Sequence, residues 1–221
     1  MRLSLLLLIF AFALGAAAQP VEGARATTKH VYNLAAPVED DDTPVGALQR
    51  TEYETYGPDG RRLRVEWRAP DGSVSLAFME LYDATDRPFG AVYFEGSDLD
   101  PTLERNEYRP RPAGGTIKQV TYINAEGDTT GVNEFVSDAE GREVERRYGV
   151  SSDGARGTDR VVYDGANATG YVYMSADGSR RREYVFRNET IDDRGNWTSR
   201  TVVRDGSPRI FETREITYRT P

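Results

Sequence analysis

RLRVEWR, residues 62–68, alternates charged side chains with apolar ones. Leu63, Val65 and Trp67 would point to one side of an extended chain, and the charged residues would point to the other. A period of two is typical of a β-strand with one buried face. This stretch therefore predicts a strand in a sheet that is covered on one side.

Turn signals recur through the rest of the chain, and each combines Asp or Asn with Gly. Asp and Asn bond to nearby backbone, and Gly supplies a positive φ at no steric cost, so we expect Gly72, Gly141 and Gly178 at positive φ. Runs rich in Val, Thr, Tyr and Phe separate the turns, and no stripe of helical period is found. The spacing predicts an all-β fold, an antiparallel meander of about ten to twelve short strands with sequential neighbours paired.

The first residues have the order of an export signal. Met1-Arg2-Leu3 precedes an apolar run to Leu14, and small residues follow as far as Ala18. We therefore predict a signal peptide over 1–18 with cleavage before Gln19. The alternative is a membrane anchor, but the apolar run is shorter than the ~20 residues needed to cross a bilayer. No later segment is apolar enough to span a membrane, and without cysteine there is no site for a lipid anchor.

Residues 19–46 show no periodicity and include the acidic run 39–42. This composition predicts a flexible acidic leader. A calcium loop is not indicated, because no Gly-containing turn wraps the carboxylates. The β-meander domain is predicted over 47–221. A Pro-rich interruption at 96–115 is expected to be a long loop, which could divide the domain into two sheets.

Composition excludes several classes of function. The formal net charge is -8, and an acidic chain argues against nucleic acid as a partner. The chain has no cysteine and a single histidine, His30, in the expected leader. This excludes disulfides, a zinc site of the usual composition and Ser-His-Asp catalysis on a rigid frame. We expect no catalytic residue, metal or cofactor, and therefore a non-enzymatic protein.

Glu80 keeps one catalytic alternative open. It lies between Met79 and Leu81 in an otherwise apolar stretch. A buried glutamate could have a raised pKa and serve a carboxylate-based hydrolase. The simpler interpretation is an outward charge that prevents sheets from pairing edge to edge.

The segment at 82–88, YDATDRP, resembles one unit of the YD (RHS-type) repeats of bacterial surface proteins, and 193–200, DRGNWTSR, is similar to their Gly-Asn-x-Thr segment. The match is partial. GYVY at 170–173 followed by ADG at 176–178 is more weakly similar to MORN-like hairpin repeats. Both resemblances imply hairpins stacked into a repeat-like sheet with a scaffold role in the bacterial cell envelope.

Aromatic residues offer the best hint of binding, since the chain holds 13 Tyr and 2 Trp. Such side chains join an apolar body to a polar tip and are enriched in contact surfaces, although they also favour strands. The candidate binding residues are Trp67, Tyr171, Tyr173 and Trp197. The sequence thus predicts an exported envelope protein, periplasmic, cell-surface or extracellular, that acts as a non-enzymatic scaffold or binding module. An envelope protein or a polysaccharide is the expected partner, and a carbohydrate-binding module with exposed aromatics is the alternative.

Overall fold

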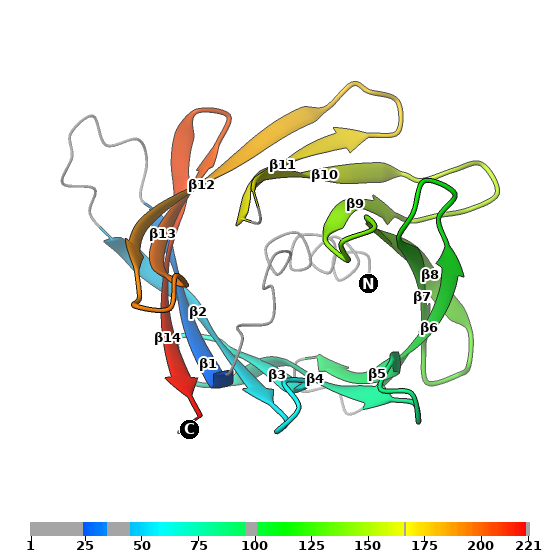
Figure 1. The fold of residues 1–221 in the computed structure, drawn as a ribbon, viewed down its shortest axis with the longest axis horizontal. Coiled ribbons are helices and arrows are strands. Elements are labelled where there is room, and N and C mark those ends of the chain that lie inside the picture. The colour runs from blue at the N-terminus through cyan, green and yellow to red at the C-terminus, as the bar shows by residue number, and fades with distance from the viewer. Residues whose placement is uncertain (1–23, 35–44, 96–100, 166, 220–221) are drawn as a thin grey trace.

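The computed structural model describes residues 24–34, 45–95, 101–165 and 167–219, and within these ranges it is built of strands and turns. The strands are β1 (Ala24–Leu34), β2 (Val45–Tyr56), β3 (Arg62–Arg68), β4 (Val74–Tyr82), β5 (Pro88–Glu95), β6 (Thr102–Pro110), β7 (Thr116–Ile123), β8 (Thr129–Ser137), β9 (Glu143–Tyr148), β10 (Gly157–Asp164), β11 (Asn167–Ser175), β12 (Arg181–Ile191), β13 (Trp197–Arg204) and β14 (Ser207–Tyr218). Each strand pairs antiparallel with the next, and β1 also pairs with β14, so the meander closes into a barrel (Figure 1).

Closure depends on β1, which lies between β2 and β14. Lys29 is opposite Arg214 and Val31 is opposite Glu212 across this seam. The prediction of a flexible leader over 19–46 is therefore wrong for Ala24–Leu34. In this segment Lys29 stands among the alternate residues that include Val31, so the strand lacks the apolar alternation that marks a strand in sequence. The acidic run 39–42 and the cleavage site lie outside the described residues.

The Pro-rich interruption expected at 96–115 also contains a strand, β6, which pairs with β5 and β7. The described part of the sheet is therefore not divided there. Its residues are polar on both faces, because Glu104 and Asn106 alternate with Arg105 and Glu107. The antiparallel meander is confirmed, but ten to twelve strands is an underestimate, and the open repeat-like sheet is in fact a closed barrel of 14 strands.

The hairpin turns have the expected chemistry. At the β3–β4 turn the amide of Gly72 donates to the carbonyl oxygen of Ala69 at 2.9 Å. The carboxylate of Asp71 accepts from the Ser73 amide at 2.9 Å. Gly72, Gly141 and Gly178 have φ of 85°, 80° and 69°, which confirms the prediction for all three.

Replacing any one of these three glycines by Val should lower the free energy of unfolding by about 1–3 kcal/mol. An added Cβ would meet no heavy atom within 4 Å at any of them, so the cost arises from the positive φ alone. Chemical denaturation of each variant measures it. Unchanged midpoints in all three variants would contradict the turn assignment.

One alternate row of side chains can be followed through the register around the barrel. Glu52 lies opposite Lys29 on one side and Trp67 on the other, and Trp67 lies opposite Leu76. This row holds most of the buried side chains, whereas the opposite row exposes Met79, Leu81, Phe94, Leu103, Val162 and Val185. A closed sheet crowds side chains on its concave side, so the buried row lines the interior.

Candidate functional site: the inner wall of the barrel

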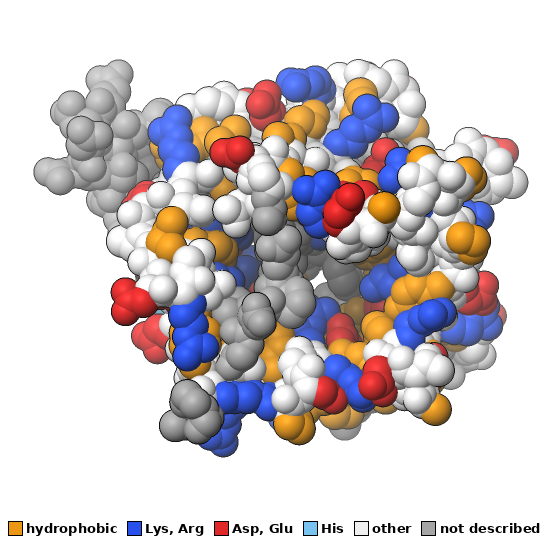
Figure 2. Space-filling view, in the orientation of Figure 1, with side chains coloured by type: hydrophobic (Ala, Val, Ile, Leu, Met, Phe, Trp, Pro, Cys, Tyr) orange, Lys and Arg blue, Asp and Glu red, His pale blue; other side chains and the backbone are white. Residues whose placement is uncertain are grey.

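The interior of the barrel is the concave side of the closed sheet. Barrels of about eight strands are filled by their own side chains, and wider barrels enclose space. With 14 strands this barrel exceeds that size, and Figure 2 shows the described side chains arranged in a ring around its centre. The wall is rich in apolar and aromatic groups, and its buried members include Val65, Leu76, Phe78, Tyr93, Val120, Tyr122, Tyr148, Tyr171 and Val202.

A chain of ion pairs crosses the closing seam on this inner wall. Glu212 is 0% exposed; its Oε2 accepts from Nε of Arg200 at 2.5 Å, and its Oε1 lies 3.4 Å from Nζ of Lys29. Lys29 Nζ also lies 2.7 Å from Oε2 of Glu52, whose Oε1 is 2.6 Å from Arg50. These pairs join β13, β14, β1 and β2 through side chains as well as backbone.

The opposite charges in this series of ion pairs keep one another ionised. Burial by itself would raise the pKa of Glu212, but the positive charges of Arg200 and Lys29 outweigh burial and hold that pKa at about 2. Burial also opposes the charge of Lys29, yet Glu212 and Glu52 leave its pKa above the ordinary value. Both groups are therefore ionised at neutral pH despite their burial.

Guanidinium groups stack on aromatic rings beside this chain. The guanidinium carbon (Cζ) of Arg214 lies 4.0 Å from the ring centroid of Trp197, and that of Arg200 lies 4.1 Å from the same centroid. Arg200 also lies 4.3 Å from the ring centroid of Phe186. The aromatic wall continues to Tyr171, whose ring centroid is 6.0 Å from that of Phe186. Cations over ring faces are stabilised by the ring quadrupole, which reduces the cost of their burial.

Inward carboxylates are engaged with partners. Glu80, the sequence candidate for a hydrolase, accepts from Arg62 at 2.6 Å and from the Tyr82 hydroxyl at 2.5 Å. Asp159 accepts from the Tyr148 hydroxyl at 2.5 Å, and burial raises the pKa of this aspartate. Glycoside hydrolysis needs one carboxylate to act as a nucleophile or base beside a second acid. The ion pair of Glu80 with Arg62 lends no support to that role.

All four candidate binding residues lie on the inner wall. The register assigns Trp67 and Tyr171 to the inner row, because Trp67 is opposite Glu52 and Tyr171 is opposite Tyr184. Tyr173 shares the face of Tyr171 on β11, and Trp197 stacks with the inward Arg200. Tyr171 is 4% exposed, and its ring stacks on Tyr184 at 4.3 Å. A role in binding remains a prediction for these residues, but the surface that they form is concave rather than an outward platform.

Sequence reasoning missed the charged residues of the seam. The signal was present in β14, where Glu212 and Arg214 occupy the same row as Ile210, Ile216 and Tyr218. Charges inside an apolar row indicate buried pairing, but of the partners of Glu212 only Arg200 is close in sequence. Lys29 and Glu52 lie more than 150 positions from Glu212 in the sequence.

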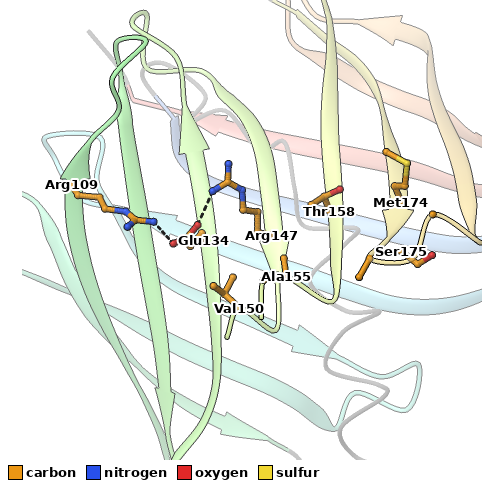
Figure 3. Close-up of a pocket in the computed structure, with 11 residues that line it drawn as sticks. Arg109, Glu134, Arg147, Val150, Ala155, Thr158, Met174 and Ser175 are labelled. Carbon is orange, nitrogen blue, oxygen red and sulfur yellow. Dashed lines mark hydrogen bonds and ion pairs between the residues drawn. The ribbon is translucent and has the colours of Figure 1, made fainter. Parts of the chain in front are cut away.

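The outer wall carries ion pairs that run along its strands. The Glu66 carboxylate accepts from Arg64 and Arg68, each at 2.5 Å. A shallow hollow of about 580 Å³ also lies on the outer wall, lined in part by Arg109, Glu134 and Arg147 (Figure 3). Arg147 lies 3.0 Å from Glu134, which also pairs with Arg109. Both arginines have Glu134 as an acidic partner, so neither guanidinium in this hollow is left without an ion pair.

Neither a metal site nor a membrane helix is found in the part of the chain that the structure describes. No group of three or more histidine, aspartate or glutamate side chains there is placed to hold a metal ion. No helix in the same residues is long and apolar enough to cross a bilayer.

Comparison with known proteins identifies no family. No family model and no curated protein matches the chain. Among solved structures, a porin-like protein from Bacteroides uniformis is 12% identical, with a TM-score of 0.38 over 88% of this chain and 96% of that one. A likeness at this TM-score carries no argument about function. These findings do not bear on the YD or MORN-like resemblance.

Proposed function

We propose that this chain is an exported bacterial envelope protein that binds a small, largely apolar ligand inside its barrel without catalysing a reaction. The observation that supports this proposal is the inner wall, which carries buried aromatic and aliphatic side chains on strands around the barrel. Ligand sites in proteins are concave and mostly apolar, with a few polar groups that fix orientation. The mouths and interiors of barrels are among their usual places.

The outer wall favours a barrel that is not embedded in lipid. Membrane barrels present an apolar band about 25 Å tall, and a basic side chain at its centre costs about 2–4 kcal/mol. Here Arg64, Glu66 and Arg68 alternate along the outer row of β3. Outward charges also lie on β6 and β9, for example Arg105 and Arg147. Together with the predicted export signal, this supports a location in the periplasm, at the cell surface or outside the cell.

Two adjacent residues of β10 provide a matched test. Val161 lies opposite Tyr171 in the inner row, and Val162 is 46% exposed on the outer wall. The mature protein is expected to bind the neutral fluorophore Nile red saturably. Val161→Trp should weaken this binding because the larger ring occupies the interior, whereas Val162→Trp should not. Fluorescence titration of both variants against wild type measures the difference.

An outward patch on β4, β5 and β6 could also attract the dye, since Met79 and Leu103 are 47% and 45% exposed. Met79→Glu therefore serves as a further control. Binding that Met79→Glu abolishes and Val161→Trp leaves unchanged would assign the dye to the outer patch and count against an interior site. Absence of any binding would leave a scaffold role as the better supported function.

A further inference from the structure

Among the described residues, five cations lie on the inner wall near the closing seam: Lys29, Arg50, Arg62, Arg200 and Arg214. Four of them lie within ion-pair distance of Glu52, Glu80 or Glu212. A buried charge without a close partner is costly, so the fifth cation calls for a counter-charge.

Arg214 is this fifth cation. It is 8% exposed, and no described carboxylate lies within ion-pair distance of it. Its Nε donates to the carbonyl oxygen of Trp197 at 3.1 Å, and its guanidinium lies over the Trp197 ring. No described residue accepts a hydrogen bond from either of its Nη groups. These two parallel donors form the fork that matches a carboxylate.

The nearby carboxylates are held by other groups. Glu54 accepts from the Tyr56 hydroxyl at 2.5 Å and from Thr27 at 3.2 Å, and it lies 3.6 Å from Arg62. Asp192 accepts from the Tyr218 hydroxyl and from the backbone amide of Asn196. Burial and the charge of Arg200 lower the pKa of Arg214, as expected of a cation that lacks a close acidic partner.

Apolar groups flank Arg214 at the end of the barrel where β1 begins and β14 ends. Tyr56 and Ala24 form a buried cluster there, against which Ile216 and Tyr218 pack. A ligand at this position would meet the guanidinium fork of Arg214 beside an apolar wall. Its chemistry would therefore be that of an amphiphile with a single anionic group.

We propose that Arg214 is the anion-recognition residue of the barrel interior and that it pairs with the carboxylate of an amphipathic ligand whose apolar part lies against Tyr56, Ile216 and Tyr218. This inference rests on the proposed interior binding function and specifies its ligand class. Trp197, which covers one face of the guanidinium, lies at the same site and reports its occupancy.

The test compares octanoate with octanol, which has the same chain length without the charge. In a Trp67→Phe background Trp197 is the one remaining tryptophan, so its fluorescence follows binding, and calorimetry gives the affinity. Octanoate should bind the wild type about tenfold or more tighter than octanol, because a hydrogen bond between two charged groups is stronger than one to a neutral hydroxyl. Arg214→Met should remove this preference, and Arg214→Lys should keep part of it. Arg105→Met, on the outer wall, should leave it unchanged.

Stability of the ligand-free variants gives a second readout. Arg214→Met should melt at or above the wild-type temperature, because it removes a buried charge without a counter-charge. A large fall would show that the guanidinium already has its partner within the folded chain and would overturn the inference. Equal binding of octanoate and octanol would overturn it too while leaving interior binding intact. Failure of octanoate, octanol and Nile red alike would overturn both proposals.

Discussion

Replacing Glu212 by Gln is expected to lower the free energy of unfolding by about 3–5 kcal/mol, the usual cost of breaking a buried ion pair from one side. The glutamine would leave Arg200 and Lys29 buried beside a neutral group, and Arg200 donates to Glu212 at 2.5 Å in the native barrel. These residues lie on three strands that meet at the closing seam. The loss should therefore appear in global unfolding by chemical denaturant rather than as local fraying.

Glu215→Gln is the matched control, since Glu215 is on the same strand but exposed on the outer wall. It should change stability by less than about 0.5 kcal/mol. Equal midpoints for Glu212→Gln and Glu215→Gln would show that the seam does not depend on the buried charges.

The difference in stability between the wild type and Glu212→Gln should depend on pH. In the folded state the pKa of Glu212 is depressed from its ordinary 4.5 to about 2. A group with a depressed folded pKa contributes stability above its unfolded pKa and loses it as the pH falls through the folded value. The advantage of wild type over Glu212→Gln should therefore be full above about pH 5 and should shrink as the pH falls toward 2. A constant difference across this window would contradict the assignment.

Gly170→Val is expected to cost about 3 kcal/mol or more, or to prevent the barrel from forming. A Cβ at Gly170 would overlap the carbonyl oxygen of Tyr184 on β12, which is backbone and cannot rotate away. The neighbouring strand would have to move, which would disturb the pairing of β11 with β12 and the stacked rings of Tyr171 and Tyr184.

Gly131→Ala separates this clash from the general effect of adding a side chain to a strand. A Cβ there would meet only a ring carbon of Tyr122 at 3.7 Å, which is ordinary contact. Gly131→Ala should fold with a near-wild-type midpoint, and thermal and denaturant unfolding compare the two variants. A Gly170→Val protein as stable as Gly131→Ala would be inconsistent with the close approach of β11 and β12.

Neither Gly170 nor Glu212 can be recognised as a critical position from the local sequence alone. Gly170 lies in GYVY, where the sequence indicates a strand but not which backbone lies against the glycine. Glu212 lies in a row that is apolar apart from two charges, and nothing nearby in the chain identifies Lys29 as its second partner. Both sites are defined by residues of neighbouring strands that the register brings alongside.

Local sequence determined the hairpins of this protein, other than the strands β1 and β6. Alternation such as that of residues 62–68 specifies strands, and Asp-Gly turns such as the one at Gly72 specify hairpins, because side-chain direction and backbone φ are properties of adjacent residues. Closure of the barrel was decided by tertiary structure alone, through the pairing of β1 with β14. That pairing made a strand of Ala24–Leu34, turned the predicted binding aromatics inward and brought Lys29 to Glu212. The physical reason is that a polar strand gains its stability from partners distant in sequence, and only the closed register supplies them.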